Sequence, residues 1–189
     1  MYMLENEHSV IDLISNDVSM MSILRIVKSL NLPDWCVCAG FVRSKVWDYL
    51  HGFHTPTPLP DIDVVYFDPE NVNEVIEKDY EEALKQLDGL LPWSVKNQAR
   101  MHQKNGNAAY LSMADGLAHF PEVCTAIGVY LDASDAVRLV APYGIDDLLH
   151  LVVHPTPFYA TEDKKALYEH RVQAKNWFAR WPRLTIHHP

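Results

Sequence analysis

Two aspartates lie inside a stretch that otherwise has the composition of a buried β-strand. Asp61 and Asp63 belong to the sequence Asp-Ile-Asp-Val-Val-Tyr-Phe, which ends at Phe67. Residues at i and i+2 of a strand point to the same face, so the two carboxylates lie close together. Like charges held in this way are costly unless a cation lies between them. The pair therefore predicts a metal site, and its oxygen-only ligands favour Mg²⁺.

A glycine turn precedes this strand along the chain. Trp35 to Ala39 has the composition of a short buried strand, Gly40 follows it, and residues 41–50 carry apolar side chains at helical spacing. Glycine lets a phosphate approach the backbone closely, and the start of a helix offers free N–H donors. Together with Mg²⁺ on the aspartates, this turn predicts a site that positions a nucleotide for attack at phosphorus.

The remaining patterns predict an α/β (α+β) fold with one mixed sheet and flanking helices. We expect a single domain over 1–189, with an N-terminal helical segment (1–31), a core (32–157) and a C-terminal helix and tail (158–189). Helices are expected at 10–14, 20–30, 72–87 and 162–177, a short helix or turn at 143–151, and strands at 93–97, 125–131 and 137–140. Residues 53–60 hold three prolines and predict a loop, and 98–107 is a polar run.

The charge balance disfavours long nucleic acid as a partner. The formal net charge is −9, from 16 Lys and Arg against 25 Asp and Glu. Binding a long phosphate backbone requires a basic face. The cluster near the C-terminus is short and interrupted by aromatics, and Trp177 and Trp181 are expected to be packing anchors. A third possible function is RNA end modification, which the acidic net charge disfavours. The basic cluster comprises His170, Arg171, Lys175, Arg180 and Arg183.

Nothing in the sequence predicts export or a membrane. The N-terminus lacks a basic region followed by an apolar run, and no stretch approaches the ~20 apolar residues of a bilayer span. Cys36 and Cys38 share one predicted strand, which is poor geometry for a disulfide, and Cys124 makes the count odd. We therefore expect reduced, buried thiols in a cytoplasmic protein.

The turn and the acidic strand resemble the nucleotidyltransferase superfamily that includes DNA polymerase β and the CCA-adding enzymes. The segment Ala39 to Ser44 is similar to the CCA-adding motif Gly-Gly-x-Val-Arg-Asp, and Asp61 to Val64 is similar to its metal-binding strand. From about Trp35 to Pro157 the chain resembles more closely a family of small bacterial nucleotidyltransferase-like proteins of undefined substrate. Its matching segments are Ala-Gly-Phe-Val-Arg-Ser-Lys-Val-Trp-Asp, Asp-Ile-Asp-Val-Val-Tyr-Phe-Asp, Trp-Ser-Val-Lys-Asn-Gln-Ala-Arg-Met-His and Ala-Pro-Tyr-Gly-Ile-Asp-Asp-Leu.

This resemblance implies an NTP substrate and a divalent cation, Mg²⁺ or Mn²⁺, held by Asp61 and Asp63. Many members carry a third carboxylate as a metal ligand or general base. Glu122, before the strand expected at Thr125, is the first candidate for it, and Asp115 is the second. The residues expected to bind the nucleotide are Gly40, Phe41, Arg43 and Ser44 at the turn, and Lys96, Asn97 and Arg100 in the donor-rich segment after the strand at 93–97.

The chain departs from the superfamily pattern at the turn. Ala39 replaces the first glycine, a mild change if its backbone torsion angles are ordinary, and Ser44 replaces an acid. The spacing from Gly40 to Asp61 is long, so the proline-rich loop resembles an insertion. The predicted function is metal-dependent transfer of a nucleoside monophosphate from an NTP to an unknown small-molecule or protein acceptor. The alternative is a catalytically silent module of the same fold that binds a nucleotide or a partner.

Overall fold

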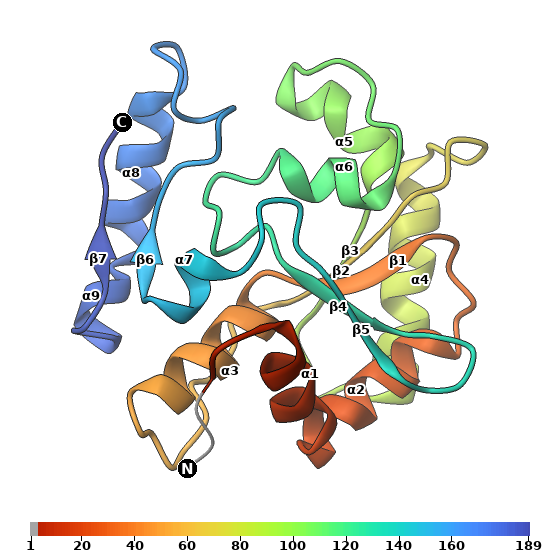
Figure 1. The fold of residues 1–189 in the computed structure, drawn as a ribbon. Coiled ribbons are helices and arrows are strands. Elements are labelled where there is room, and N and C mark those ends of the chain that lie inside the picture. Colours follow the sequence, from red (N-terminus) through yellow and green to blue (C-terminus); the bar gives the residue numbers. More distant parts are fainter. Residues whose placement is uncertain (1–3) are drawn as a thin grey trace.

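The computed structural model describes residues 4–189 and contains a five-stranded mixed sheet with helices on both faces (Figure 1). The strand order is β3-β2-β1-β4-β5. The β1 strand pairs antiparallel with β2 and β4, β4 pairs antiparallel with β5, and β2 pairs parallel with β3. This arrangement confirms the predicted mixed α/β fold. The strands are β1 (Trp35–Cys38), β2 (Ile62–Tyr66), β3 (Trp93–Asn97), β4 (Gly128–Leu131) and β5 (Val137–Val140).

Successive side chains of each strand point to opposite faces of the sheet, and both faces are buried. Val37 and Val64 point into the larger core, which contains apolar side chains of the first four helices. Cys36 and Val65 point to the opposite face, where they pack against Met113 of α6. Strands with apolar residues on both faces predict this three-layer packing. The helices are α1 (Glu7–Ser15), α2 (Val18–Lys28), α3 (Gly40–Leu50), α4 (Glu74–Leu87), α5 (Gln98–Asn105) and α6 (Met113–Ala118).

Local signals explain where several helices begin. Asp17 is the N-cap of α2, and its carboxylate accepts a 2.9 Å hydrogen bond from the N–H of Met20. The polar run after β3 forms a helix, α5, because the side chain of Asn97 caps it by accepting from the N–H of Ala99 at 3.0 Å. Helix α6 was not predicted, since its six residues are too few to show a helical period.

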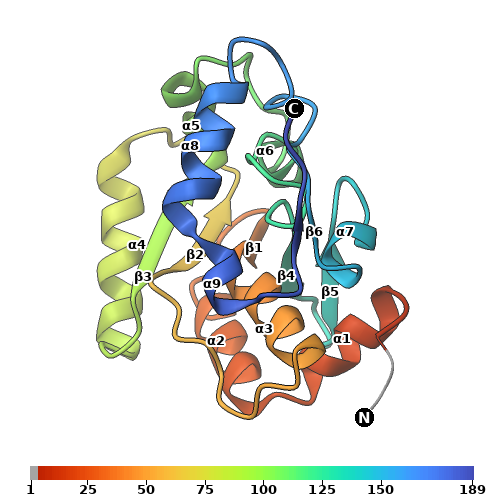
Figure 2. The ribbon, with the colours of Figure 1, turned by 90° about the vertical axis from the view of Figure 1, so that its left-hand side faces the viewer.

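The C-terminal segment packs beside the sheet as a separate layer. Figure 2 shows α8 and α9 in front of the strands, with the chain returning toward β6. Strand β7 pairs parallel with β6, a contact that sequence analysis missed because two-residue strands carry no periodic signal. The elements of this segment are α7 (Asp146–Leu149), β6 (Val152–Val153), α8 (Lys165–Lys175), α9 (Trp177–Arg180) and β7 (Thr185–Ile186).

Three tryptophans hold this layer against α3. The ring of Trp47 on α3 lies edge-to-face with Trp177 at 5.8 Å and with Trp181 at 5.1 Å between centroids. The two C-terminal rings are therefore packing anchors, as predicted. The helix expected over 162–177 ends at Lys175, because Asn176 adopts a left-handed conformation with φ +44°.

The structure also tests the predicted state of the cysteines and shows the lengths of the helices. Cys36, Cys38 and Cys124 are all buried and free, as expected. Among residues 4–189, no helix combines the length and apolar character that a membrane span requires.

Candidate active site

The two aspartates lie at the edge of the sheet where β1 ends and β2 begins. Because β1 and β2 are antiparallel, Cys38 at the end of β1 pairs with Asp63 near the start of β2. The turn at Gly40 follows Cys38 directly and lies next to the acids. The topology therefore brings the two halves of the predicted motif together, although 20 residues separate Gly40 from Asp61.

These two halves line one cavity of about 510 Å³. The β1–α3 turn and the first turn of α3 contribute one wall, which includes Gly40, Arg43 and Ser44. Asp61 and Asp63 contribute the second wall, next to the proline-rich loop. The third wall comes from α8 and α9 at the other end of the chain, and this wall is absent from the sequence-based site. Its charged members are Arg171, Lys175 and Arg180.

The negative charges of Asp61 and Asp63 are not neutralised by a neighbouring side chain that the structure describes, as expected of a site that binds a cation. Among the described residues, neither Asp61 nor Asp63 forms a salt bridge. Burial, and after it the charge of Asp61, raises the pKa of Asp63 to about 6, although the positive charges of Lys175, Arg171 and Arg43 oppose the rise. An unpaired carboxylate pair of this kind is stabilised in its charged form by a divalent cation.

The donor set fits a hard metal ion that keeps several ligands from solvent or substrate. Within residues 4–189, no three side chains of His, Cys, Asp or Glu lie close enough together to share a metal. Mg²⁺ is bound in this way, by one or two carboxylates with phosphate and water oxygens completing its octahedron. Asp61 and Asp63 are therefore the residues that would hold it.

The first turn of α3 is open toward an anion. Ala39 precedes the helix with φ +56° and ψ −119°, and no side chain caps the helix start. Its torsion angles are thus not ordinary for an L-residue, so the change from glycine to alanine at this position is not a mild one. The first N–H groups of any helix lack intrahelical acceptors, and they carry the positive end of the helix dipole. This end of α3 lies at the cavity wall.

Arg43, Ser44 and Phe41 differ in how they face the cavity. The guanidinium of Arg43 lies 4.4 Å from the ring centroid of Trp177 and donates a 3.1 Å hydrogen bond from Nη1 to Thr125 Oγ1. Its Nε is buried and has no hydrogen-bond partner among the described residues. Ser44 is buried and lines the cavity. The side chain of Phe41 instead points into the larger core, so only its backbone faces the helix start.

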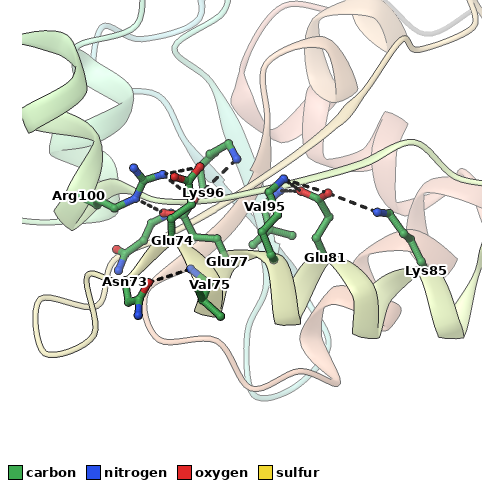
Figure 3. Close-up of polar contacts among 11 residues, drawn as sticks. Asn73, Glu74, Val75, Glu77, Glu81, Lys85, Val95, Lys96 and Arg100 are labelled. Carbon is green, nitrogen blue, oxygen red and sulfur yellow. Dashed lines mark hydrogen bonds and ion pairs between the residues drawn. The ribbon is translucent and has the colours of Figure 1, made fainter.

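The structure does not bring Lys96, Asn97 or Arg100 into this cavity. Strand β3 is parallel to β2, so its end at Asn97 pairs with Tyr66, at the far end of β2 from the aspartates. Lys96 and Arg100 point toward Glu77 on α4 (Figure 3), and the side chain of Asn97 donates 2.7 and 3.1 Å hydrogen bonds to the carbonyls of Asp68 and Asn71. Arg100 makes two 2.8 Å hydrogen bonds to Glu77, and Lys96 lies 3.6 Å from the same carboxylate. A nucleotide-binding role for these three residues rests on the sequence pattern alone.

The two candidates for a third carboxylate also lie apart from the acidic pair. Glu122 is fully buried, and its Oε1 accepts a 2.6 Å hydrogen bond from Nε of Arg171. Asp115 on α6 accepts a 2.8 Å hydrogen bond from the N–H of Leu111. Since the structure groups neither with Asp61 and Asp63, the pair stands without a third protein carboxylate among residues 4–189.

The comparisons with known proteins decide the family. A family model described as nucleotidyltransferase matches residues 25–186, which is most of the chain and more than the resemblance at 35–157 covered. The chain belongs to this nucleotidyltransferase family. A solved NMR structure described as revealing a CCA-adding enzyme head domain is 33% identical, with a TM-score of 0.86 over 98% of both chains. No curated protein sequence matches this nucleotidyltransferase.

More distant structures share only the fold. A Thermotoga maritima CCA-adding enzyme complexed with tRNA is 17% identical, with a TM-score of 0.59. A CCA-adding enzyme complexed with CTP is 16% identical, with a TM-score of 0.60. The present chain covers 43% and 44% of these two proteins, so it spans less than half of their length.

Proposed function

We propose that this nucleotidyltransferase binds an NTP with Mg²⁺ in the cavity and transfers the nucleoside monophosphate to a small-molecule or protein acceptor. The observation that carries the proposal is the shared cavity: two carboxylates without a salt bridge face the uncapped start of α3. The family membership supports the same reaction class.

The acidic residues of the cavity would bind the metal ion, and the backbone N–H groups and Arg43 would bind the phosphates. A bound divalent cation would neutralise the triphosphate and the charge that develops at the α-phosphorus. Asp61 and Asp63 hold that cation, the N–H groups at Gly40 bind phosphate oxygens, and Arg43 adds positive charge. An acceptor hydroxyl forms the new bond to the α-phosphorus, pyrophosphate leaves, and the hydroxyl proton is released. Catalysis of this kind depends on positioning and electrostatic stabilisation.

Pyrophosphate release tests the proposal. The protein would be incubated with Mg²⁺ and each α-labelled NTP, with itself, cell extract and small hydroxyl compounds as acceptors. We expect label transfer and pyrophosphate release, both lost in the Asp61→Asn/Asp63→Asn variant. The variant Asp79→Asn/Glu82→Gln removes the same charge from the exposed face of α4 and should retain both. If the double variant at the cavity binds NTP and Mg²⁺ as well as the parent, the metal assignment is wrong.

One observation favours the second candidate, a silent binding module. Within the part of the chain that the structure describes, no third carboxylate lies with the acidic pair, whereas many members of the superfamily use one for metal binding or as a base. A silent module would bind NTP with Mg²⁺ through Asp61 and Asp63 yet release no pyrophosphate with any acceptor. Binding without release across all four NTPs would therefore select this alternative.

A further inference from the structure

The cavity carries a local charge opposite to that of the chain. Among the described residues that line it, four are cationic and two are acidic, whereas the whole chain has a net charge of −9. Three of the four cations lie on α8 and α9. A concave site with excess positive charge concentrates anions, even on an acidic protein. Asp61 and Asp63 would hold a metal ion, and among the described residues neither forms a salt bridge with these cations.

The two cations of α8 face the cavity by helical spacing. Arg171 and Lys175 are four residues apart and share one face of the helix. Tyr168 and Val172, also four apart, form an adjacent buried row on the same side of the helix, because Tyr168 is three residues from Arg171 and seven from Lys175. The hydroxyl of Tyr168 donates to the carbonyls of Val153 and His187, at 3.2 and 2.8 Å, which ties the helix to β6 and to the residue that follows β7. Helix α8 is thus held in one orientation.

Arg171 is also held from the core by a buried carboxylate. Glu122 is 0% exposed, and the Arg171 side chain is 34% exposed at the cavity. The backbone of Glu122 is itself fixed by a bridge to Pro155 and by hydrogen bonds to its carbonyl from Thr125 and Ala126, both at 3.0 Å. A buried carboxylate is costly unless paired. Glu122 therefore keeps Arg171 in place near the middle of α8.

We propose that α8 is the polyphosphate-binding arm of this nucleotidyltransferase, with Glu122 as the positioning residue that holds Arg171 toward the phosphates. The proposal rests on the proposed function and deepens it: the metal lies at the acidic pair, and the phosphates beyond the α-phosphate lie against Arg171 and Lys175. Buried Arg43, with its unpartnered Nε, completes the anion site between the turn and the arm. Glu122 acts through Arg171 and not as a third metal ligand.

A matched pair elsewhere in the fold provides the control. Glu77 is also 0% exposed and holds Arg100 through two 2.8 Å hydrogen bonds (Figure 3), but neither residue lines the cavity. Glu77→Gln and Glu122→Gln thus each break an ion pair between a buried glutamate and an arginine, and Glu77 in addition accepts from the N–H of Asn97 at 3.1 Å. Only the second disturbs a cation that faces the cavity.

The test measures binding of inorganic tripolyphosphate in EDTA by calorimetry, and binding of Mn²⁺ alone. We expect Glu122→Gln to weaken tripolyphosphate binding about tenfold and to leave Mn²⁺ affinity unchanged. Loss of a negative charge near an anion site would by itself tighten anion binding, so weakening identifies positioning. Arg171→Gln should weaken binding to a similar degree, and the double variant no further. Glu77→Gln should leave both affinities unchanged.

Exposed variants keep the test decisive if Glu122→Gln does not fold. Lys175 is exposed, so Lys175→Gln should fold and weaken tripolyphosphate binding, whereas Lys165→Gln, on α8 but outside the cavity, should not. Tripolyphosphate binding unaffected by Arg171→Gln and Lys175→Gln would overturn the proposal, as would loss of Mn²⁺ binding in Glu122→Gln. Because the probe contains no nucleotide or metal, a protein without turnover that still shows these losses would refute the proposed function alone.

Discussion

Ala39 and Gly40 form a strained entry to α3. Ala39 has φ +56°, a conformation that favours glycine and costs an alanine about 1–3 kcal/mol. Such strain persists where the surrounding structure imposes it, here by the hydrogen bond from the N–H of Ala39 to the carbonyl of Ile127 at 2.9 Å. The strained residue lies directly at the cavity, which agrees with a functional use of the turn.

Gly40→Ala should separate binding from folding. A Cβ at this position would lie 3.6 Å from Nη2 of Arg43 and 3.7 Å from Leu59, ordinary contacts that the protein tolerates. We expect the free energy of unfolding to stay the same, and NTP affinity to fall about tenfold, which is about 1.4 kcal/mol, because the methyl group occupies the path of a phosphate. Thermal unfolding and calorimetry measure the two effects. Unchanged NTP affinity would show that no phosphate approaches Gly40.

Asp63→Asn should stabilise the metal-free protein above pH 6. The pKa of Asp63 is raised from 3.8 to about 6, so the folded state holds a proton that the unfolded state releases. The parent therefore loses stability as the pH rises from about 4 to about 6, and each unit of pKa corresponds to about 1.4 kcal/mol. We expect a gain of at most about 3 kcal/mol in EDTA at neutral pH, shrinking toward zero near pH 4. Urea unfolding at several pH values measures it.

A bound divalent metal should make the parent more stable than Asp63→Asn, the reverse of the order in EDTA. The parent gains stability from Mg²⁺ or Mn²⁺, whereas Asp63→Asn gains none, since it lacks a ligand. A variant less stable than the parent in EDTA would contradict the account of the acidic pair as an unpaired, mutually repelling site.

At the scale of elements, the position of the C-terminal layer depends on α3. The indole N–H of Trp181 donates a 2.8 Å hydrogen bond to Asp48 on α3, and the same carboxylate accepts from the N–H and hydroxyl of Thr57, both at 2.6 Å. One buried aspartate thus joins α3, the proline-rich loop and the segment after α9. All three border the cavity.

Trp181→Phe and Trp181→Ala should lower the free energy of unfolding by different amounts. The phenylalanine keeps the ring against Trp47 and loses one charge-assisted hydrogen bond, so we expect a loss of about 1–2 kcal/mol in the free energy of unfolding. The alanine also leaves a cavity and should cost about 3–5 kcal/mol. Denaturant unfolding measures both. Equal losses in the two variants would mean that ring packing contributes nothing to the attachment of this layer.

At the scale of the whole molecule, nucleic acid should bind weakly. Four of the 16 Lys and Arg residues line a cavity of about 510 Å³, and the chain as a whole has a net charge of −9. We expect tRNA to bind no tighter than about 10⁻⁴ M near physiological salt. Fluorescence anisotropy at about 50 and about 200 mM salt checks this. Tight binding with a steep salt dependence would instead favour RNA end modification.

Sequence analysis predicted the sheet and the acidic half of the site because those signals are local. The turn at Gly40 and the spacing of Asp61 and Asp63 are read directly from neighbouring residues, and antiparallel pairing of β1 with β2 joins them. The cationic half could not be placed in the same way. Arg171 lies far along the chain, and only the packing of α8 brings it to the acids. The i, i+4 spacing of Arg171 and Lys175 beside the apolar row of Tyr168 and Val172 was the one available signal.

The contacts of Glu122 and of the segment after β3 could not be predicted from the sequence and were seen only in the structure. Glu122 precedes the β4 segment as a third acid might, but a sequence does not show that a distant arginine pairs with it. Lys96, Asn97 and Arg100 are rich in donors, yet the parallel pairing of β2 and β3 carries them to the other end of the strand. A composition dense in donors does not distinguish a phosphate site from a buried ion pair with Glu77.

The central claim is that Asp61 and Asp63 hold a metal ion against a nucleotide in this cavity. A crystal soaked with Mn²⁺ and a non-hydrolysable NTP tests it most directly, because anomalous scattering locates the metal independently of the refined chain. The account predicts an anomalous peak between the two carboxylates, with the triphosphate between Gly40 and Arg171. A nucleotide bound elsewhere, or Mn²⁺ ligated by neither aspartate, would contradict it.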